Sequence, residues 1–161
     1  MSVTTKQSAK VTLPADDQIL ITREFDAPRH LVFRAWTEPD LIRRWWHANR
    51  GEIKSVEVDL RVGGTWRYVM VADGDVEVAF HGEFLEIVPD ERVVHTEVYE
   101  AMPDGQAVET VEFNEVDGRT LVTMLVQLQK KEHRDAYIES GMEDGLQDAL
   151  DMLEEVAISL A

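Results

Sequence analysis

The sequence of 161 residues contains no cysteine, and this absence removes several kinds of chemistry at once. Without a thiol, the chain has no disulfide, no thiolate nucleophile and no thiolate ligand for a metal ion. The sequence also lacks any apolar run that approaches the ~20 residues of a transmembrane helix, and its first residues lack the apolar region of a signal peptide. We therefore expect a cytoplasmic protein that does not insert into a membrane.

Basic residues are scarce relative to acidic ones. The sequence has 16 Lys and Arg residues against 32 Asp and Glu residues, which gives a formal net charge of −16 at pH 7. A surface with this charge repels phosphate backbones and anionic lipids, so nucleic acids and acidic membranes are not expected as partners. The simplest role of the excess charge is to keep the protein soluble.

Motifs of metal sites and hydrolases are also missing. The five histidines are scattered, and no two of them have the i,i+4 or i,i+2 spacing that is typical of metal ligands. No nucleophile-elbow motif is present, and Gly63-Gly64 is not followed by the Lys and the helix of a phosphate-binding loop. We therefore predict no metal site and no cofactor.

The length suits one domain, and the first part of the chain mixes strand and helix patterns. Residues 1–17 show no apolar period, so we predict a flexible N-terminal tail before a domain over residues 18–161. Apolar and polar residues alternate over residues 19–25, which indicates a first strand. Two short helices are predicted next, one from residues 26–28 onward and one after Pro39.

From Glu52 onward the apolar period is two, the period of a β-strand. Six strands joined by short turns are predicted in succession at residues 52–60, 66–70, 76–88, 92–100, 108–116 and 120–130. Residues 130–140 link them to a final segment in which apolar residues recur at three- and four-residue steps, as in an amphipathic helix. The order β-α-α-β6-α predicts an α+β domain whose curved antiparallel sheet of seven strands closes on a long C-terminal helix. Such a sheet leaves space near the two short helices, where a ligand site is expected.

Four stretches of the sequence carry a resemblance to a known family. They are ITREFDAPRHLVFRAWTEPDLIRRWW, VEVDLRVGGTWRYVM, GEFLEIVPDERVVHTE and SGMEDGLQDALDMLEE. In this order and spacing, over nearly all of residues 18–158, the chain resembles the START-like (SRPBCC) superfamily, and within it bacterial proteins related to the activator of the heat-shock-protein-90 ATPase (AHSA-like). The resemblance implies the helix-grip fold and an apolar cavity. It does not imply one function, because members bind lipids, hormones and polyketides, assist chaperones, or catalyse cyclisation.

Two departures from the family pattern bear on function. The eukaryotic chaperone activator carries an additional N-terminal domain, for which this chain has no room, so the resemblance argues against activation of the chaperone ATPase. Many relatives have aromatic residues where this sequence has His95 and Glu97, and a Trp where it has Met142. The sequence is similar to a bacterial subgroup with HTE and SGM at these places, which implies a pocket that is more polar at one point.

Large apolar side chains are the candidates for the wall of the pocket. Aromatic rings can stack on a flat apolar ligand and methionines give an adaptable lining, although the same residues are equally consistent with an ordinary core. The predicted ligand-binding residues are Trp45, Trp46, Trp66, Tyr68, Met70, His95, Glu97, Phe113, Met124, Tyr137, Met142, Leu146 and Leu150.

His95, Glu97 and Tyr99 share one side of a predicted strand, because side chains alternate between its two faces. If this side faces the cavity, a nearby carboxylate favours the protonated imidazole of His95 while burial opposes it. The group could then hold a ligand hydroxyl or carbonyl, or act as acid and base. The alternative is that the other set, which begins at Val94, faces inward and the His95 side is solvated. The family alignment favours the inward orientation of His95.

Three hypotheses for function follow. The first is a small-molecule binding domain for a lipid-like or aromatic ligand with one polar handle. The second is an enzyme of the cyclase or hydrolase type that uses His95 with Glu97 or Tyr99 as acid and base. The third is a chaperone accessory or stress-response interaction protein, which predicts an exposed apolar patch rather than a cavity. A monomer and a homodimer both stay open.

Overall fold

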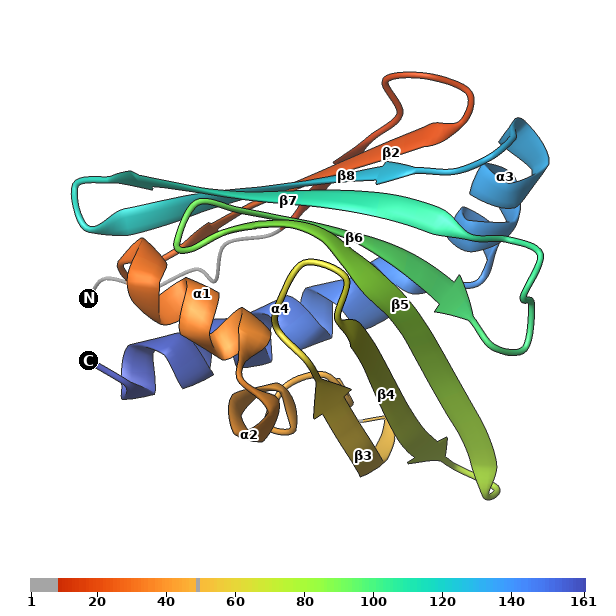
Figure 1. The fold of residues 1–161 in the computed structure, drawn as a ribbon, viewed down its shortest axis with the longest axis horizontal. Coiled ribbons are helices and arrows are strands. Elements are labelled where there is room, and N and C mark those ends of the chain that lie inside the picture. The colour runs from red at the N-terminus through yellow and green to blue at the C-terminus, as the bar shows by residue number, and fades with distance from the viewer. Residues whose placement is uncertain (1–8, 49) are drawn as a thin grey trace, which may run out of the picture.

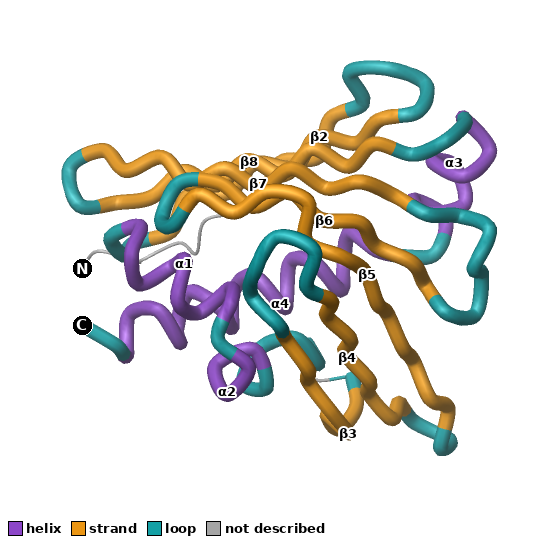
Figure 2. The backbone as a smooth tube through the Cα atoms, in the orientation of Figure 1, coloured by secondary structure: helices purple, strands orange, loops and turns teal. Residues whose placement is uncertain are grey.

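The computed structural model describes residues 9–48 and 50–161, which form one antiparallel sheet and four helices (Figures 1 and 2). The strands are β1 (Lys10–Thr12), β2 (Gln18–Phe25), β3 (Gly51–Val58), β4 (Thr65–Ala72), β5 (Val76–Val88), β6 (Arg92–Tyr99), β7 (Ala107–Val116) and β8 (Arg119–Gln127). The helices are α1 (Arg29–Thr37), α2 (Pro39–Ile42), α3 (Lys131–Glu139) and α4 (Met142–Ser159).

The sheet has the strand order β1-β2-β8-β7-β6-β5-β4-β3, and neighbouring strands are antiparallel. Strands β3 to β8 form the predicted meander, and β2 pairs along its whole length with β8. In Figure 1 the sheet bends, so that β3, β4 and β5 run steeply away from β2, β7 and β8, and α4 lies in the angle between the two parts. The predicted curved antiparallel sheet around a long C-terminal helix is confirmed.

The sheet has eight strands rather than the seven predicted, because three residues of the predicted tail pair with β2. Lys10 lies opposite Thr22, and Thr12 lies opposite Leu20. Three residues are too few for an alternation to show in the sequence, and the free edge of β2 supplies their pairing instead. Ala9 is also fixed, since its backbone N–H and C=O bond to the Gln147 side chain at 3.0 and 2.8 Å. The prediction of a flexible tail is therefore wrong for residues 9–12, while residues 1–8 lie outside the described part.

The segment that links the sheet to the last helix is itself helical. The sequence predicts only a connection over residues 130–140, whereas the structure has α3 there. Seven consecutive polar residues, 129–135, interrupt any apolar stripe, so periodicity gives no helix signal. Arg134 holds α3 in place: it is buried and donates from Nη1 to the carbonyl oxygen of Ala15 at 3.0 Å.

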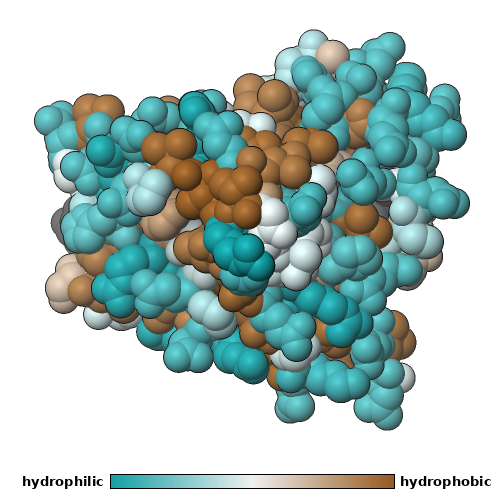
Figure 3. Space-filling view, viewed as in Figure 1, coloured by the Kyte–Doolittle hydropathy of each residue, from teal (hydrophilic) through white to brown (hydrophobic). Residues whose placement is uncertain are grey.

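The face shown in Figure 3 is mostly hydrophilic, as the net charge of −16 leads one to expect, with a group of apolar residues near its middle. Over the described part of the chain, the large apolar side chains with the most exposed surface include Val62, Val116 and Val76. None of the helices in this part is both long enough and apolar enough to span a membrane.

The core lies between the inner face of the sheet and helices α1 and α4. A charged side chain of β2 is buried beside it. Arg23 of β2 is only 2% exposed. Its Nη1 lies 2.8 Å from Asp151 Oδ1 and its Nη2 lies 3.2 Å from Glu154 Oε1, both on α4. Its guanidinium carbon also lies 5.0 Å from the centre of the Phe25 ring. Because a buried charge is tolerated only when it is paired, this contact fixes the position of α4 along β2.

We expect Arg23→Ala to lower the free energy of unfolding by about 3 kcal/mol, because it leaves Asp151 and Glu154 without their counter-charge. Denaturant unfolding measures the loss. Arg34→Ala is the control, because the Arg34–Glu38 pair at 2.8 Å is exposed and lies within one helix. An exposed pair of this kind is screened by solvent and contributes far less than a buried one. Equal losses in the two variants would contradict the role given to Arg23.

Candidate functional site

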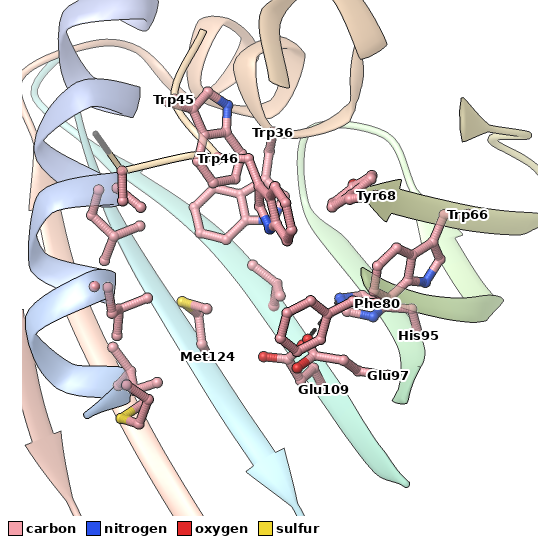
Figure 4. A pocket seen from close by; sticks show the side chains of 18 of the residues that line it. Trp36, Trp45, Trp46, Trp66, Tyr68, Phe80, His95, Glu97, Glu109 and Met124 are labelled. Carbon is pink, nitrogen blue, oxygen red and sulfur yellow. Dashed lines mark ion pairs between the residues drawn. The ribbon is translucent and has the colours of Figure 1, made fainter. Parts of the chain in front are cut away.

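A pocket of about 310 Å³ lies between α4, the inner face of the sheet and the loop that follows α2 (Figure 4). All of the predicted ligand-binding residues except Phe113 line this pocket. These residues are Trp45, Trp46, Trp66, Tyr68, Met70, His95, Glu97, Met124, Tyr137, Met142, Leu146 and Leu150.

Two predicted site residues lie elsewhere. Phe113 is buried on β7, where it packs against α1. Its ring contacts those of Phe33 and Trp36 edge to face, with 5.4 and 5.7 Å between ring centres, so it belongs to the core. Tyr99 is 37% exposed and stacks on Phe80 with 4.9 Å between ring centres. Strand alternation does put Tyr99 on the side of Glu97, but Tyr99 is the last residue of β6 and lies beyond the pocket. It is therefore not a candidate acid or base of this site.

Four aromatic rings form a continuous wall of the pocket. Trp46 contacts Tyr68 at 5.4 Å and Phe80 at 5.8 Å, and Trp66 contacts Tyr68 at 4.8 Å between ring centres. Tyr68 of β4 and Phe80 of β5 lie directly opposite each other in the sheet register. Offset and edge-to-face contacts of this kind stabilise the rings in fixed orientations. The rings of the wall therefore hold one another in place.

Gly82 makes the position of Trp66 possible. The Trp66 indole Nε1 donates a hydrogen bond to the carbonyl oxygen of Thr96 at 3.2 Å, across the face of Gly82. A Cβ atom at Gly82 would collide with that carbonyl oxygen and lie 2.6 Å from the indole nitrogen. Gly82 is therefore a point of close approach between the strands and the indole ring.

His95, Glu97 and Glu109 lie together at one end of the pocket (Figure 4). Tyr137 also lines the pocket and contacts Glu97, and we name these four ionisable residues the polar cluster. The Tyr137 hydroxyl donates to Glu97 Oε1 at 3.3 Å. His95 Nε2 lies 3.7 Å from Glu109 Oε2. The side of β6 that carries His95 and Glu97 thus faces inward, which excludes the alternative orientation with the Val94 set inside.

Glu109 is the functional candidate that the sequence analysis missed. It lies on β7 directly opposite His95 and is only 5% exposed. The signal was present, because Glu109 occupies an inner position in the alternation of Ala107, Val111 and Phe113. A carboxylate at an inner position of a strand is unusual, and its partner across the sheet becomes known only with the register.

The hydrogen-bond partners fix where protons lie on His95. Its Nδ1 is 3.2 Å from the carbonyl oxygen of Thr96, which can only accept, so Nδ1 carries the hydrogen. In the neutral imidazole, Nε2 then holds a lone pair and faces a Glu109 carboxyl oxygen. This end of the pocket therefore presents two neighbouring acceptors, Nε2 of His95 and a carboxyl oxygen of Glu109, to a hydrogen-bond donor.

Burial sets the protonation of the cluster. Burial, reinforced by the charge of Glu109 and a hydrogen bond with it, raises the pKa of Glu97 well above its usual value. Burial lowers the pKa of His95, although the nearby Glu97 opposes this. Burial and the two carboxyl groups also raise the pKa of Tyr137. The directions of these shifts favour a protonated Glu97, a neutral His95 and a Tyr137 that keeps its hydroxyl hydrogen.

Across the described residues there is no group of three or more potential ligands that could hold a metal ion. The polar cluster offers its side chains for hydrogen bonding and proton transfer.

The description "Activator of Hsp90 ATPase homolog 1-like protein" belongs to a family model that matches residues 26–157. A solved structure from Rhodobacter sphaeroides is 22% identical, with a TM-score of 0.88 over 94% of this chain and 99% of that one. Protein NE0264 from Nitrosomonas europaea is 27% identical, with a TM-score of 0.80 over 92% and 98%. A protein from Mycobacterium smegmatis is 20% identical, with a TM-score of 0.82 over 91% and 94%. These likenesses show the START-like, helix-grip fold. No curated protein matches the chain.

The protonated state of Glu97 predicts a pH dependence of stability. An acid with a raised pKa keeps its proton in the folded protein but loses it in the unfolded chain above about pH 4.5, so its contribution falls as the pH rises. Glu97→Gln replaces this titrating carboxyl group by an amide that does not titrate. Its free energy of unfolding relative to the wild type should therefore increase as the pH rises above about 4.5, by at most ~1.4 kcal/mol per pH unit.

Denaturant unfolding at a series of pH values measures this difference. The lowered pKa of His95 acts in the opposite direction, below the ordinary value of 6.5, and is present in both proteins. Glu112→Gln, which removes an exposed carboxylate from β7, is the control. A Glu97→Gln difference that stays constant over the whole range would show that Glu97 is not buried as an acid.

Proposed function

The chain belongs to the activator of Hsp90 ATPase homolog 1-like family, and from this premise we propose that it is a small-molecule binding domain for a lipid-like or aromatic ligand. One observation carries the proposal: a pocket of about 310 Å³ has an aromatic wall on one side and the polar cluster at one end. Apolar pockets with a few convergent polar groups are typical ligand sites. The cytoplasmic location remains a prediction.

The size of the pocket argues for a ligand rather than for an ordinary core. A single water occupies about 30 Å³ of liquid volume, and protein interiors leave few voids larger than that. The pocket is about ten times larger and lies at the lower end of the volumes of ligand sites. Helix α4 keeps the space open at Gly145, where an added Cβ would meet no atom within 4 Å.

The polar cluster gives the ligand an orientation. Glu97 as an acid and Tyr137 as a hydroxyl can each donate or accept, while His95 Nε2 accepts. A ligand with one polar end and an apolar body can place the polar end here and lay its body along the rings of Trp46 and Phe80. Polar groups buried with the ligand then find partners, as buried polar groups require.

A second candidate function is acid–base catalysis on the bound molecule. The observation that favours it is that His95 and Glu97 line the same pocket, while burial lowers the pKa of His95 and raises the pKa of Glu97, as suits a base beside an acid. We expect such an enzyme to convert a ligand that it binds, and Glu97→Gln to slow this conversion by about 10²-fold or more with binding retained. Mass spectrometry of the recovered ligand measures conversion. A ligand recovered unchanged after prolonged incubation leaves binding as the function.

For the binding function, we expect lipid-like or aromatic ligands to be retained by the protein in native mass spectrometry and to bind in isothermal titration calorimetry. Leu146→Trp fills the pocket from α4 and should weaken this binding by about tenfold or more, because the ligand loses its space. Ile158→Trp is the matched control, since Ile158 lies on the same helix, is 47% exposed and does not line the pocket. Unchanged binding in Leu146→Trp would place the ligand elsewhere and contradict the proposal.

A further inference from the structure

Among the described residues, the two carboxyl groups that line the pocket, Glu97 and Glu109, have no Lys or Arg partner. Across residues 9–48 and 50–161, no Lys or Arg side chain forms an ion pair with Glu97 or Glu109, and the ion-pair candidate nearest to them is His95. Arg50 also lines the pocket, but its guanidinium lies 2.7 Å from Asp148 at the surface. Buried carboxyl groups in proteins are normally paired with a cation or with several donors.

The rings beside these carboxyl groups are of the kind that attract cations. Trp66 lies 5.4 Å from the His95 ring, and Tyr68 lies 4.8 Å from Trp66 between ring centres. Figure 4 shows Phe80, Trp66 and His95 at the same end of the pocket as Glu97 and Glu109. Aromatic faces attract ammonium groups, most strongly where water is excluded. Carboxyl groups and rings together thus form a surface that suits a positive charge.

We propose, on the basis of the binding function above, that the pocket selects an amphipathic primary amine, whose ammonium group lies between Glu97 and Glu109 and whose apolar body lies along the aromatic wall. This goes beyond an apolar ligand with one polar group, because it specifies that the polar group carries a positive charge and three N–H donors.

The count of donors and acceptors supports an amine over other polar ends. An ammonium group has three N–H donors, and the cluster offers three acceptor groups in the two carboxyl groups and His95 Nε2. A hydroxyl has one donor and leaves acceptors unpaired. A carboxylate would meet two carboxyl groups in a medium of low dielectric constant, which is unfavourable.

Amine binding should displace the proton that Glu97 holds, because the ammonium group replaces it between the carboxyl groups. The ionisable groups that line this pocket are His95 and Glu97 on β6, Glu109 on β7, Tyr137 on α3, Tyr68 on β4, and His47 and Arg50 on the loop after α2. Burial raises the pKa of Tyr68 and Tyr137, so neither tyrosine supplies this proton near neutral pH. We therefore expect the proton that is released when the amine binds to come from Glu97.

The test compares three ligands that differ only in the polar end, phenylbutylamine, phenylbutanol and phenylbutyrate, by isothermal titration calorimetry with the full chain at neutral pH. We expect the amine to bind at least about tenfold more tightly than the alcohol, and phenylbutyrate to bind most weakly. Titrations in buffers of different ionisation enthalpy should show a proton released with the amine and none with the alcohol.

Glu109→Gln keeps the shape of the side chain and removes one carboxylate, so it should bring the amine and the alcohol to within about threefold of each other. Retained binding of the alcohol shows that the pocket of this variant is intact. Glu112→Gln, on the same strand but exposed, should leave the preference unchanged.

An alcohol that binds as tightly as the amine, or a preference for the amine that survives Glu109→Gln, would overturn the amine inference while ligand binding stands. If none of the three ligands binds, and a wider lipid and aromatic library also fails, the proposed binding function fails and the amine inference fails with it.

Discussion

The packing of α4 against the bent sheet is the constraint on which the rest of the molecule depends. The C-terminal half of this helix is tightly held: Leu150, Leu153 and Ala157 are at most 1% exposed, and Arg23 joins this half to β2 through Asp151 and Glu154. The N-terminal half is thinly covered, because Gly145 has no side chain and Leu146 is only half-buried. The helix therefore closes the sheet at one end and leaves the pocket at the other. A helix packed evenly along its length would fill this space with its own side chains.

The register of β6 then decides what chemistry the pocket contains. A slip of one residue would turn His95 and Glu97 to the outer face and bring the Val94 set inside. Pairing on both sides prevents this slip, since β6 lies between β5 and β7 and His95 is opposite both Phe84 and Glu109. An inner face of valine and threonine would pack without buried ionisable groups and would stabilise the core more simply. A buried cluster that opposes stability in this way is typical of a functional site.

Sequence periodicity was sufficient for the sheet meander and the last helix, because each of those elements is long enough to show its period. It was not sufficient for β1, whose three residues depend on the edge of β2, or for α3, whose stripe is interrupted by charged residues. In the site, alternation gives the face of a strand but not the position along it. For this reason His95 and Glu97 line the pocket as expected, whereas Tyr99 lies beyond the end of the pocket and Phe113 packs against α1. The alternation of β7 marks Glu109 as an inner residue, but its place opposite His95 follows only from the cross-strand register, which the local sequence does not contain.

Ligand binding and catalysis make opposite demands on the same atoms. A cationic ligand between Glu97 and Glu109 would occupy the lone pair of His95 Nε2 and remove the proton from Glu97, so neither residue could then transfer a proton. A neutral ligand would leave the acid and the base in place, with the aromatic wall providing the binding energy. The charge of the ligand therefore separates the two functions. Among the described residues, no Lys or Arg forms an ion pair with the two carboxyl groups of the polar cluster, and this imbalance favours a bound cation over a neutral substrate.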